Sequence, residues 1–295
     1  MSRSTSLGEQ KSVRLTHGTI RYRERGEGPP VVFVSGFAVN GDLWRNVVPA
    51  VAESHRCITP DIPLGAHEMP MDDDADLSLA GLADMVVEFL DRLELERVTL
   101  VGNDTGGGVV QVIAGRYPER VDRIVLTPSD CFELMPPPMF WFLPWIGYIP
   151  GSIFLLLQSL RIPALRRTPI AFGWLAKRSV PAEVASSYLS PGLGNRLVRR
   201  DIAKVSRALS PAYTQTACEQ LRHFERPVLL VWPREDRLFP YAYAERLAAL
   251  LPDATLVPVD DSYTFVPEDQ PEVLAQHINE FLADRRARSG HPEAA

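Results

Sequence analysis

The sequence predicts an α/β fold in which helices flank a mostly parallel, doubly wound sheet. Short apolar runs recur along the chain, a pattern typical of strands that are buried on both faces. Between several of these runs the apolar residues repeat with the period of a helix. Strands that alternate with helices build parallel sheets, because each helix packs back onto the sheet. The 295 residues are enough to bury a large core in this arrangement.

The predicted elements follow one another along the chain. Alternating apolar and polar residues around a His-Gly turn indicate an antiparallel hairpin over residues 13–26. Ser78 is a candidate N-cap for a helix whose apolar residues continue to Leu93 with the helical period, and another helix is expected over residues 106–121. The strands of the parallel part of the sheet are predicted at residues 29–36, 56–61, 97–103, 123–129, 227–233 and 254–259.

The alternation of strands and helices stops after the strand at residues 123–129, which is the sixth strand when the two strands of the hairpin are counted. The segment that follows is rich in proline, in aromatic residues and in helix-like runs, which indicates a helical cap inserted into the α/β core. The polar ends of the chain are expected to be disordered. The expected division is a core at residues 13–130 and 212–285, a cap at residues 131–211, and disordered ends at residues 1–12 and 286–295.

Residues 134–160 carry no charge, so they are the one stretch that resembles a membrane segment. Prolines and glycines interrupt them, so they would span a bilayer poorly as a single helix. We therefore interpret them as buried or cavity-lining, with contact to a membrane surface as the lesser alternative, and we expect no stable membrane insertion.

Composition narrows the class of partner. The net charge of −6 argues against a nucleic-acid surface. The three cysteines are widely spaced, which favours reduced thiols in a cytoplasm, and the polar N-terminus has no apolar region typical of a secretory signal. No residues have metal-ligand spacing, and no dinucleotide or phosphate-loop pattern occurs. We expect a cytoplasmic protein without a cofactor that binds a small molecule, and a homodimer remains possible.

The strongest motif is Gly-Asn-Asp-Thr-Gly at residues 102–106, between a predicted strand and a predicted helix. A nucleophile on such a turn has a strained backbone, so the residues two positions before and after it must be very small. Gly102 and Gly106 satisfy this requirement around Asp104. The helix that follows places backbone N–H groups beside the carboxylate, where they stabilise negative charge. Asp104 is therefore a candidate nucleophile; an aspartate in a polar turn is the alternative.

This motif resembles the nucleophile elbow of the α/β-hydrolase superfamily, and specifically the branch with an aspartate nucleophile, which includes epoxide hydrolases and haloalkane dehalogenases. Residues 31–51, 234–240 and 261–274 resemble further segments of that branch, and the resemblance extends from the hairpin to about Leu282. It implies that Asp104 attacks an sp3 carbon and forms an alkyl-enzyme ester.

The same resemblance assigns other site residues. It implies that the backbone N–H groups of Phe37 and Thr105 form an oxyanion hole. Asp236 has the position of the acid that orients the catalytic histidine. Thr264, however, has the position of that histidine, and a threonine hydroxyl cannot accept a proton at neutral pH as an imidazole does. Loss of a positioned base typically slows catalysis by about 10²–10⁴-fold, so turnover should stall after the ester has formed.

Two other residues are candidates for the missing function. His67 lies just beyond the C-terminal end of the strand at residues 56–61, where sites of α/β proteins assemble. It is either a relocated base or a histidine that packs a loop. Asp130 follows the strand at residues 123–129, near an alternative acid position of the family, and is either that acid or a hinge residue of the cap.

The predicted cap holds three candidate pocket residues. Tyr148 and Tyr188 are possible counterparts of the cap tyrosines that protonate an epoxide oxygen, and Trp141 is a candidate for the roof of an apolar cavity. Packing within the cap is the alternative for all three. Phe37 and Thr105 replace the Asn and Trp with which dehalogenases hold a halide, so the resemblance does not predict halide binding.

We therefore expect an enzyme of the hydrolase type that acts through Asp104 on an epoxide or on an ester- or alkyl-type bond of a small, largely apolar substrate. One alternative is a non-hydrolytic isomerase, cyclase or lyase in which a buried Asp104 transfers protons. The other is a ligand-binding protein that has lost turnover.

Overall fold

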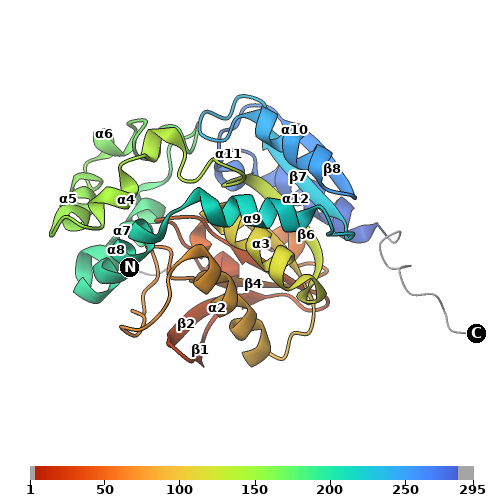
Figure 1. Cartoon of the computed structure of the whole chain (residues 1–295), viewed down its shortest axis with the longest axis horizontal. Helices are drawn as coiled ribbons and strands as arrows, with labels where there is room; N and C mark the ends of the chain where they lie inside the picture. Colours follow the sequence, from red (N-terminus) through yellow and green to blue (C-terminus); the bar gives the residue numbers. More distant parts are fainter. Residues whose placement is uncertain (1–3, 285–295) are drawn as a thin grey trace, which may run out of the picture.

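The computed structural model describes residues 4–284, and its centre is one eight-stranded sheet (Figure 1). The strand order is β1-β2-β4-β3-β5-β6-β7-β8, with antiparallel pairing from β1 to β4 and parallel pairing between all later neighbours. The mostly parallel α/β fold is confirmed. The strands are Glu9–Leu15 (β1), Gly18–Arg25 (β2), Pro30–Val34 (β3), Arg56–Pro60 (β4), Val98–Asp104 (β5), Val121–Ser129 (β6), Val228–Pro233 (β7) and Ala254–Val259 (β8).

The N-terminal segment departs from the prediction of a disordered end at residues 1–12. β1 begins at Glu9, and a short 3-10 helix, η1, covers Thr5–Leu7. The Leu7 side chain is fully buried, and the backbone N–H of Ser4 donates to Asp42 Oδ1 at 3.0 Å. One apolar anchor in an otherwise polar segment thus orders residues that composition alone assigns to a tail. The other predicted tail, 286–295, lies outside the described residues.

Helices cover both faces of the sheet. α2, α3, α9 and α10 pack side by side on one face, and α1 and α12 pack together on the other (Figure 1). The predicted N-cap of α2 is confirmed, because Ser78 Oγ accepts a hydrogen bond from the Gly81 N–H at 3.2 Å. The bounds are Val48–Val51 (α1), Leu79–Arg92 (α2), Thr105–Arg116 (α3), Pro211–Leu221 (α9), Tyr241–Leu250 (α10) and Pro271–Ala283 (α12).

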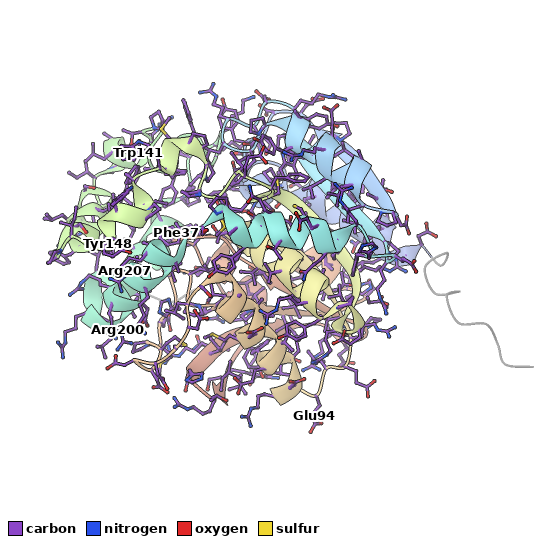
Figure 2. The ribbon with its side chains drawn as sticks, in the orientation of Figure 1. Phe37, Glu94, Trp141, Tyr148, Arg200 and Arg207 are labelled. Atoms are coloured by element: carbon purple, nitrogen blue, oxygen red, sulfur yellow. The ribbon has the colours of Figure 1, made fainter. Side chains whose placement is uncertain are left out.

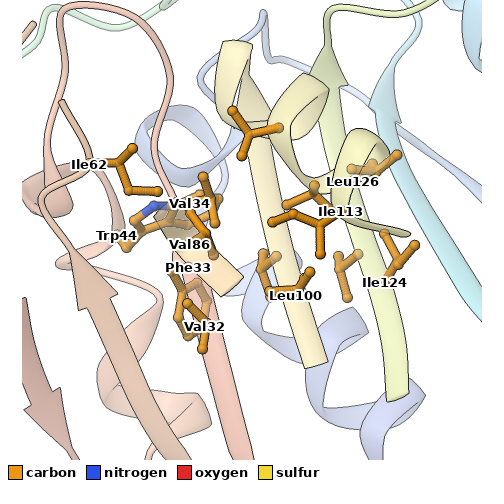
Figure 3. Packing of buried hydrophobic residues seen from close by; sticks show 14 of the residues in the cluster. Val32, Phe33, Val34, Trp44, Ile62, Val86, Leu100, Ile113, Ile124 and Leu126 are labelled. Carbon is orange, nitrogen blue, oxygen red and sulfur yellow. The ribbon is translucent and has the colours of Figure 1, made fainter. Parts of the chain in front are cut away.

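The central strands are buried on both faces, as their continuous apolar runs predict. Side chains of β3, β5 and β6 interdigitate with those of α2 and α3 (Figure 3). Phe33 of β3 packs on Trp44 with ring centroids 5.3 Å apart, and the Trp44 Nε1–H donates to Ser35 Oγ at 3.0 Å. These contacts fix the segment after β3 against the core, and β3 itself pairs with β5. The core thus determines where the carboxyl ends of these two strands lie.

Residues 134–208, here called the insertion, connect β6 to α9 (Figure 1). Apart from an isolated β-bridge between Leu134 and Cys131, their regular structure is helical. No helix in residues 4–284 is both long and apolar enough to cross a membrane. The helices of the insertion are Pro138–Phe140 (η4), Leu143–Ile146 (α4), Ser152–Ser159 (α5), Pro163–Arg166 (α6), Ala182–Gly194 (α7) and Arg196–Ala208 (α8), and the remaining short helices of the chain are Gly41–Trp44 (η2), Pro118–Arg120 (η3) and Val266–Asp269 (α11).

Candidate active site

Asp104 is the last residue of β5 and the N-cap of α3, and its backbone has φ 54° and ψ −133°. A non-glycine residue rarely adopts such a conformation, and holding it costs of the order of 1–3 kcal/mol. Close packing around the turn fixes it in place. A Cβ on Gly106 would lie 2.4 Å from the Val34 carbonyl oxygen, and one on Gly107 would lie 1.9 Å from Ser129 Oγ. The glycines therefore let the turn approach β3 and β6 closely.

The carboxylate of Asp104 is held through one oxygen. Oδ1 accepts hydrogen bonds from the Thr105 N–H at 2.5 Å, the Thr105 hydroxyl at 2.9 Å and the Phe37 N–H at 3.3 Å. These are the two backbone groups that the resemblance implied for an oxyanion hole. Burial raises the pKa of Asp104, and the three donors oppose that rise. The geometry thus orients the carboxylate and leaves Oδ2 outside this set of hydrogen bonds.

A second carboxyl group lies beside the first. Asp130 directly follows β6, and its backbone N–H donates to the Asp104 carbonyl at 3.4 Å. The Gln111 side-chain N–H donates to the Asp130 carbonyl at 2.7 Å and holds this turn in place. Asp130 Oδ1 is buried without a hydrogen-bond partner. Burial, together with the negative charge of Asp104, raises the pKa of Asp130 well above its usual range, so Asp130 takes up a proton more readily than Asp104 does.

Both carboxyl groups line one cavity of about 90 Å³ beneath the insertion. Apart from Asp104, Thr105 and Asp130, its walls are apolar, and among the described residues none of the histidines lines it. Such a lining favours an apolar ligand. The apolar lining is formed by Phe37, Ala38, Pro136, Pro137, Phe140, Phe142, Leu143, Leu156, Leu160, Ile170, Ala171, Phe172, Leu175, Leu189 and Leu209.

Asp236 and Thr264 form a buried pair outside this lining. The Thr264 hydroxyl donates to Asp236 Oδ2 at 3.0 Å. Asp236 Oδ1 accepts from the backbone N–H groups of Leu238 at 2.8 Å and Phe239 at 2.7 Å. Burial outweighs these donors and raises the pKa of Asp236 to about 7. The Asn103 side chain, next to Asp104 in sequence, donates to the Thr264 carbonyl at 2.8 Å and so ties this loop to the elbow.

His67 lies elsewhere. Its Nε2 is 3.2 Å from Asp201 Oδ2, both side chains are buried, and His67 does not line the Asp104 cavity. Asp201 also accepts a hydrogen bond from the Met71 N–H at 2.8 Å. The pair thus connects the loop after β4 to α8. Of the two interpretations of His67, the geometry fits the loop-packing one, because the chain holds the imidazole against α8 instead of Asp104.

None of the three aromatic residues suggested for the substrate pocket lines the cavity. Trp141 and Tyr148 are 67% and 65% exposed and lie on the outer side of the insertion (Figure 2). Tyr188 is buried and packs edge-on against Phe172, with centroids 6.1 Å apart. The pocket assignment of these residues is therefore corrected. Short helices in an apolar segment offer no clear period, so the sequence does not reveal which aromatic side chains face inward.

The sequence did not predict which individual residues of the insertion line the cavity. Phe140 and Phe142 flank Trp141 in sequence, and Phe172 lies in a turn without strong helical periodicity. The sequence indicated only that residues 134–160 as a whole are uncharged, and we interpreted that segment as buried or cavity-lining. The interpretation of residues 134–160 as buried or cavity-lining fits the side that faces the cavity. It is wrong for the other side, where Trp141, Trp145 and Leu155 are exposed.

The chain matches the α/β hydrolase fold family over residues 29–271 and therefore belongs to that family. It is 27% identical over 280 residues to a cis-3-alkyl-4-alkyloxetan-2-one decarboxylase of Shewanella oneidensis, covering 90% of this chain and 85% of that protein. It is 26% identical to haloalkane dehalogenase 2 of Mycobacterium tuberculosis over 278 residues, covering 90% of this chain and 92% of that protein.

Among solved structures, the fold is similar to that of the epoxide hydrolase CorEH, with a TM-score of 0.78, 20% identity, and coverage of 93% of this chain and 98% of that one. The family match supports an enzyme of the α/β-hydrolase family, and the similarity to CorEH shows the fold.

Proposed function

We propose that this enzyme uses Asp104 as a nucleophile on an sp3 carbon of a small, apolar substrate and opens a carbon–oxygen bond, as in an epoxide. The observation that carries the proposal is the arrangement of three donors on Asp104 Oδ1. They aim Oδ2 at the ligand, and they hold the oxygen that becomes the carbonyl oxygen of the ester. Preorganised donors of this kind are a large source of catalysis in a buried site.

Asp130 supplies the proton in this proposal. As Asp104 Oδ2 bonds to the ring carbon of an epoxide, the carbon–oxygen bond breaks and its electron pair stays on the oxygen. The protonated carboxyl of Asp130 gives its proton to that oxygen, which yields a hydroxyalkyl ester of Asp104 and an Asp130 carboxylate. The raised pKa of Asp130 suits this role, because it makes Asp130 the carboxyl group of the pair that holds a proton more readily.

Hydrolysis then uses the same two residues. The Asp130 carboxylate takes a proton from water, and the resulting hydroxide attacks the carbonyl carbon of the ester. The Phe37 and Thr105 N–H groups stabilise the tetrahedral oxyanion. Its collapse breaks the ester bond and expels the alkoxide, which takes the proton of the newly formed Asp104 carboxyl. The products are the diol, an Asp104 carboxylate and a protonated Asp130. This route requires no histidine. Once Asp104 is a neutral ester, its negative charge no longer raises the pKa of Asp130. The Asp130 carboxylate is then a weaker base, and we infer that hydrolysis is slow.

A second candidate is a lyase reaction without water. It is favoured by the absence of a histidine from the described cavity lining and by the similarity to an oxetan-2-one decarboxylase. Asp104 would attack the ring carbon that bears the ring oxygen and open the lactone to a carboxylate. The carbon–carbon bond to the carboxylate would then break and release CO₂. The electron pair of that bond would form a C=C bond, and the Asp104 carboxylate would leave. Neither a proton nor a base enters this sequence.

The test is intact-protein mass after incubation with a terminal alkyl epoxide, a 1-bromoalkane or a cis-dialkyl β-lactone. We expect an adduct in the native protein and none in Asp104→Asn. Asp130→Asn should still alkylate with the bromoalkane, whose leaving halide needs no proton, and should lose the adduct with the epoxide. A single turnover of the epoxide in ¹⁸O-water should label Asp104, because water attacks the ester carbonyl.

The outcomes separate the candidates. Alkene and CO₂ from the lactone, with no diol from the epoxide, would favour the lyase. If product forms without an ester and without ¹⁸O in the protein, Asp104 acts by proton transfer and not as a nucleophile. If Asp104→Asn retains full activity toward all probes, the proposal fails.

A further inference from the structure

Large apolar side chains are exposed on one part of the surface. Within residues 4–284, the exposed ones lie between Trp141 and Ile170, with Leu197 the sole exception. Single exposed apolar residues are ordinary, but their accumulation on one segment marks an interaction site. We call this surface the apolar face; its residues are Trp141, Trp145, Tyr148, Ile149, Phe154, Leu155, Ile162, Leu165 and Ile170.

The same segment has an unusual charge. Between Glu133 and Glu183 the chain has no acidic residue, whereas its overall net charge is −6. Lys177 is engaged by Glu235 at 2.8 Å and by Asp261 at 2.9 Å, at the border with the core. The basic residues of the segment are Arg161, Arg166, Arg167, Lys177 and Arg178. Those of α6 and its flanks therefore add positive charge next to the apolar face, on a protein that is otherwise acidic.

The mouth of the Asp104 cavity opens on this face. Ile170 lines the cavity and is also 53% exposed, so it lies at the rim. Phe140, Phe142 and Leu156 line the cavity and are only half-buried. Trp141 lies between the first two of these in sequence and points away from the sheet (Figure 2). A ligand that enters from this side passes over apolar side chains.

We propose that the apolar face docks on the surface of a bilayer that contains anionic lipids. Tryptophan and tyrosine favour the boundary between headgroups and acyl chains, where the ring meets hydrocarbon and the polar edge meets water. Basic residues beside them add attraction to anionic headgroups. A second copy of the chain fits less well, because pairing the two faces symmetrically would place like charges opposite each other.

Docking gives the cavity a source of ligand. A lipophilic compound dissolved in the bilayer would reach Asp104 through the mouth at Ile170 without crossing water. Only this delivery of a ligand to Asp104 rests on the proposed function. The docking surface itself is independent of Asp104, so Asp104→Asn should bind membranes as the native protein does.

The experiment is co-sedimentation of the full chain with vesicles of phosphatidylcholine, alone or with roughly a third phosphatidylglycerol. We expect binding to the anionic vesicles and much weaker binding to the neutral ones. The triple variant Trp141→Ser/Trp145→Ser/Leu155→Ser and the double variant Arg166→Glu/Arg167→Glu should each lower the apparent affinity about tenfold or more. Tryptophan fluorescence should shift to the blue on binding in the native protein.

The matched control is Arg97→Glu/Arg222→Glu, which changes the net charge by the same amount at exposed sites outside the insertion. It should bind like the native protein, and thermal unfolding should show that all variants fold. Equal loss in the control would mean that only overall charge matters and would overturn the proposal. Absence of binding to anionic vesicles would also overturn it, as would a dimer in sedimentation velocity that the triple variant dissociates while vesicles remain unbound.

Discussion

The Thr264 hydroxyl donates a 3.0 Å hydrogen bond to Asp236 Oδ2, at the point where the family resemblance places a histidine and its acid. Both side chains are buried, and the Asp236 carboxyl keeps two backbone donors on its other oxygen. The acid therefore retains its site, and its partner is a hydroxyl that donates a hydrogen bond but cannot take up a proton at neutral pH. The pair can position the loop at residues 261–265 but cannot activate water.

We predict that Thr264→His increases hydrolysis. The imidazole would take the place of the hydroxyl beside Asp236, which would orient it as a base. A positioned base is worth about 10²–10⁴-fold in rate, and the larger side chain should cost about 1–3 kcal/mol of stability at this fully buried position. The measurement is product release from a pre-formed Asp104 ester, followed by mass spectrometry. Thr264→Gln is the control of similar size without a basic nitrogen; equal deacylation in both variants would contradict the prediction.

We predict that stability falls as the pH rises from about 4 to 7. Asp236 has a pKa of about 7 in the folded protein, whereas the ordinary pKa of an aspartate is 3.8. Between these values the folded state binds more protons than the unfolded state, so the free energy of unfolding decreases with pH. For Asp130 the pKa shift has the same direction and adds to this decrease. Urea unfolding at pH 5, 6 and 7 should show this slope, and Asp130→Asn should flatten it. A stability that rises with pH over this range would refute the assignment.

The sequence predicted the parts of this protein that depend on local rules. The strands of the parallel sheet, the Ser78 cap and the elbow at Asp104 each follow from residues close together in sequence. The environment of His67 did not, because its partner Asp201 lies 134 residues away and nothing local distinguishes a packing histidine from a base. The cavity lining of the insertion was also out of reach, since an apolar segment of short helices has no polar side to orient it.

We predict that Asp104→Gly stabilises the fold while it abolishes ester formation. The φ of 54° at Asp104 costs an aspartate about 1–3 kcal/mol and costs a glycine little. Loss of the buried carboxylate removes a further penalty, and loss of the hydrogen bonds to Oδ1 offsets part of the gain. We expect a net increase of about 1 kcal/mol in the free energy of unfolding. Asp104→Asn retains the backbone strain and separates the two effects; a larger gain in Asn than in Gly would show that charge, not strain, dominates.

The last prediction compares two neighbouring glycines of α3. A Cβ on Gly106 would lie 2.4 Å from the Val34 carbonyl oxygen and 2.5 Å from that of Ser35. These are backbone atoms that cannot move without shifting β3. Gly106→Ala should therefore destabilise the protein by about 3 kcal/mol or more and displace the oxyanion hole.

A Cβ on Gly108, by contrast, would meet its nearest neighbour, Asp130 Cβ, at 3.4 Å, which is ordinary contact. Because Gly108 lies in the interior of α3, Gly108→Ala should stabilise the helix by about 0.5–1 kcal/mol. Urea unfolding of the two variants, together with the rate of adduct formation at Asp104, makes the comparison. Similar losses of stability in both variants would mean that α3 is less closely packed on β3 than these contacts require, and the strained conformation of Asp104 would then need another support.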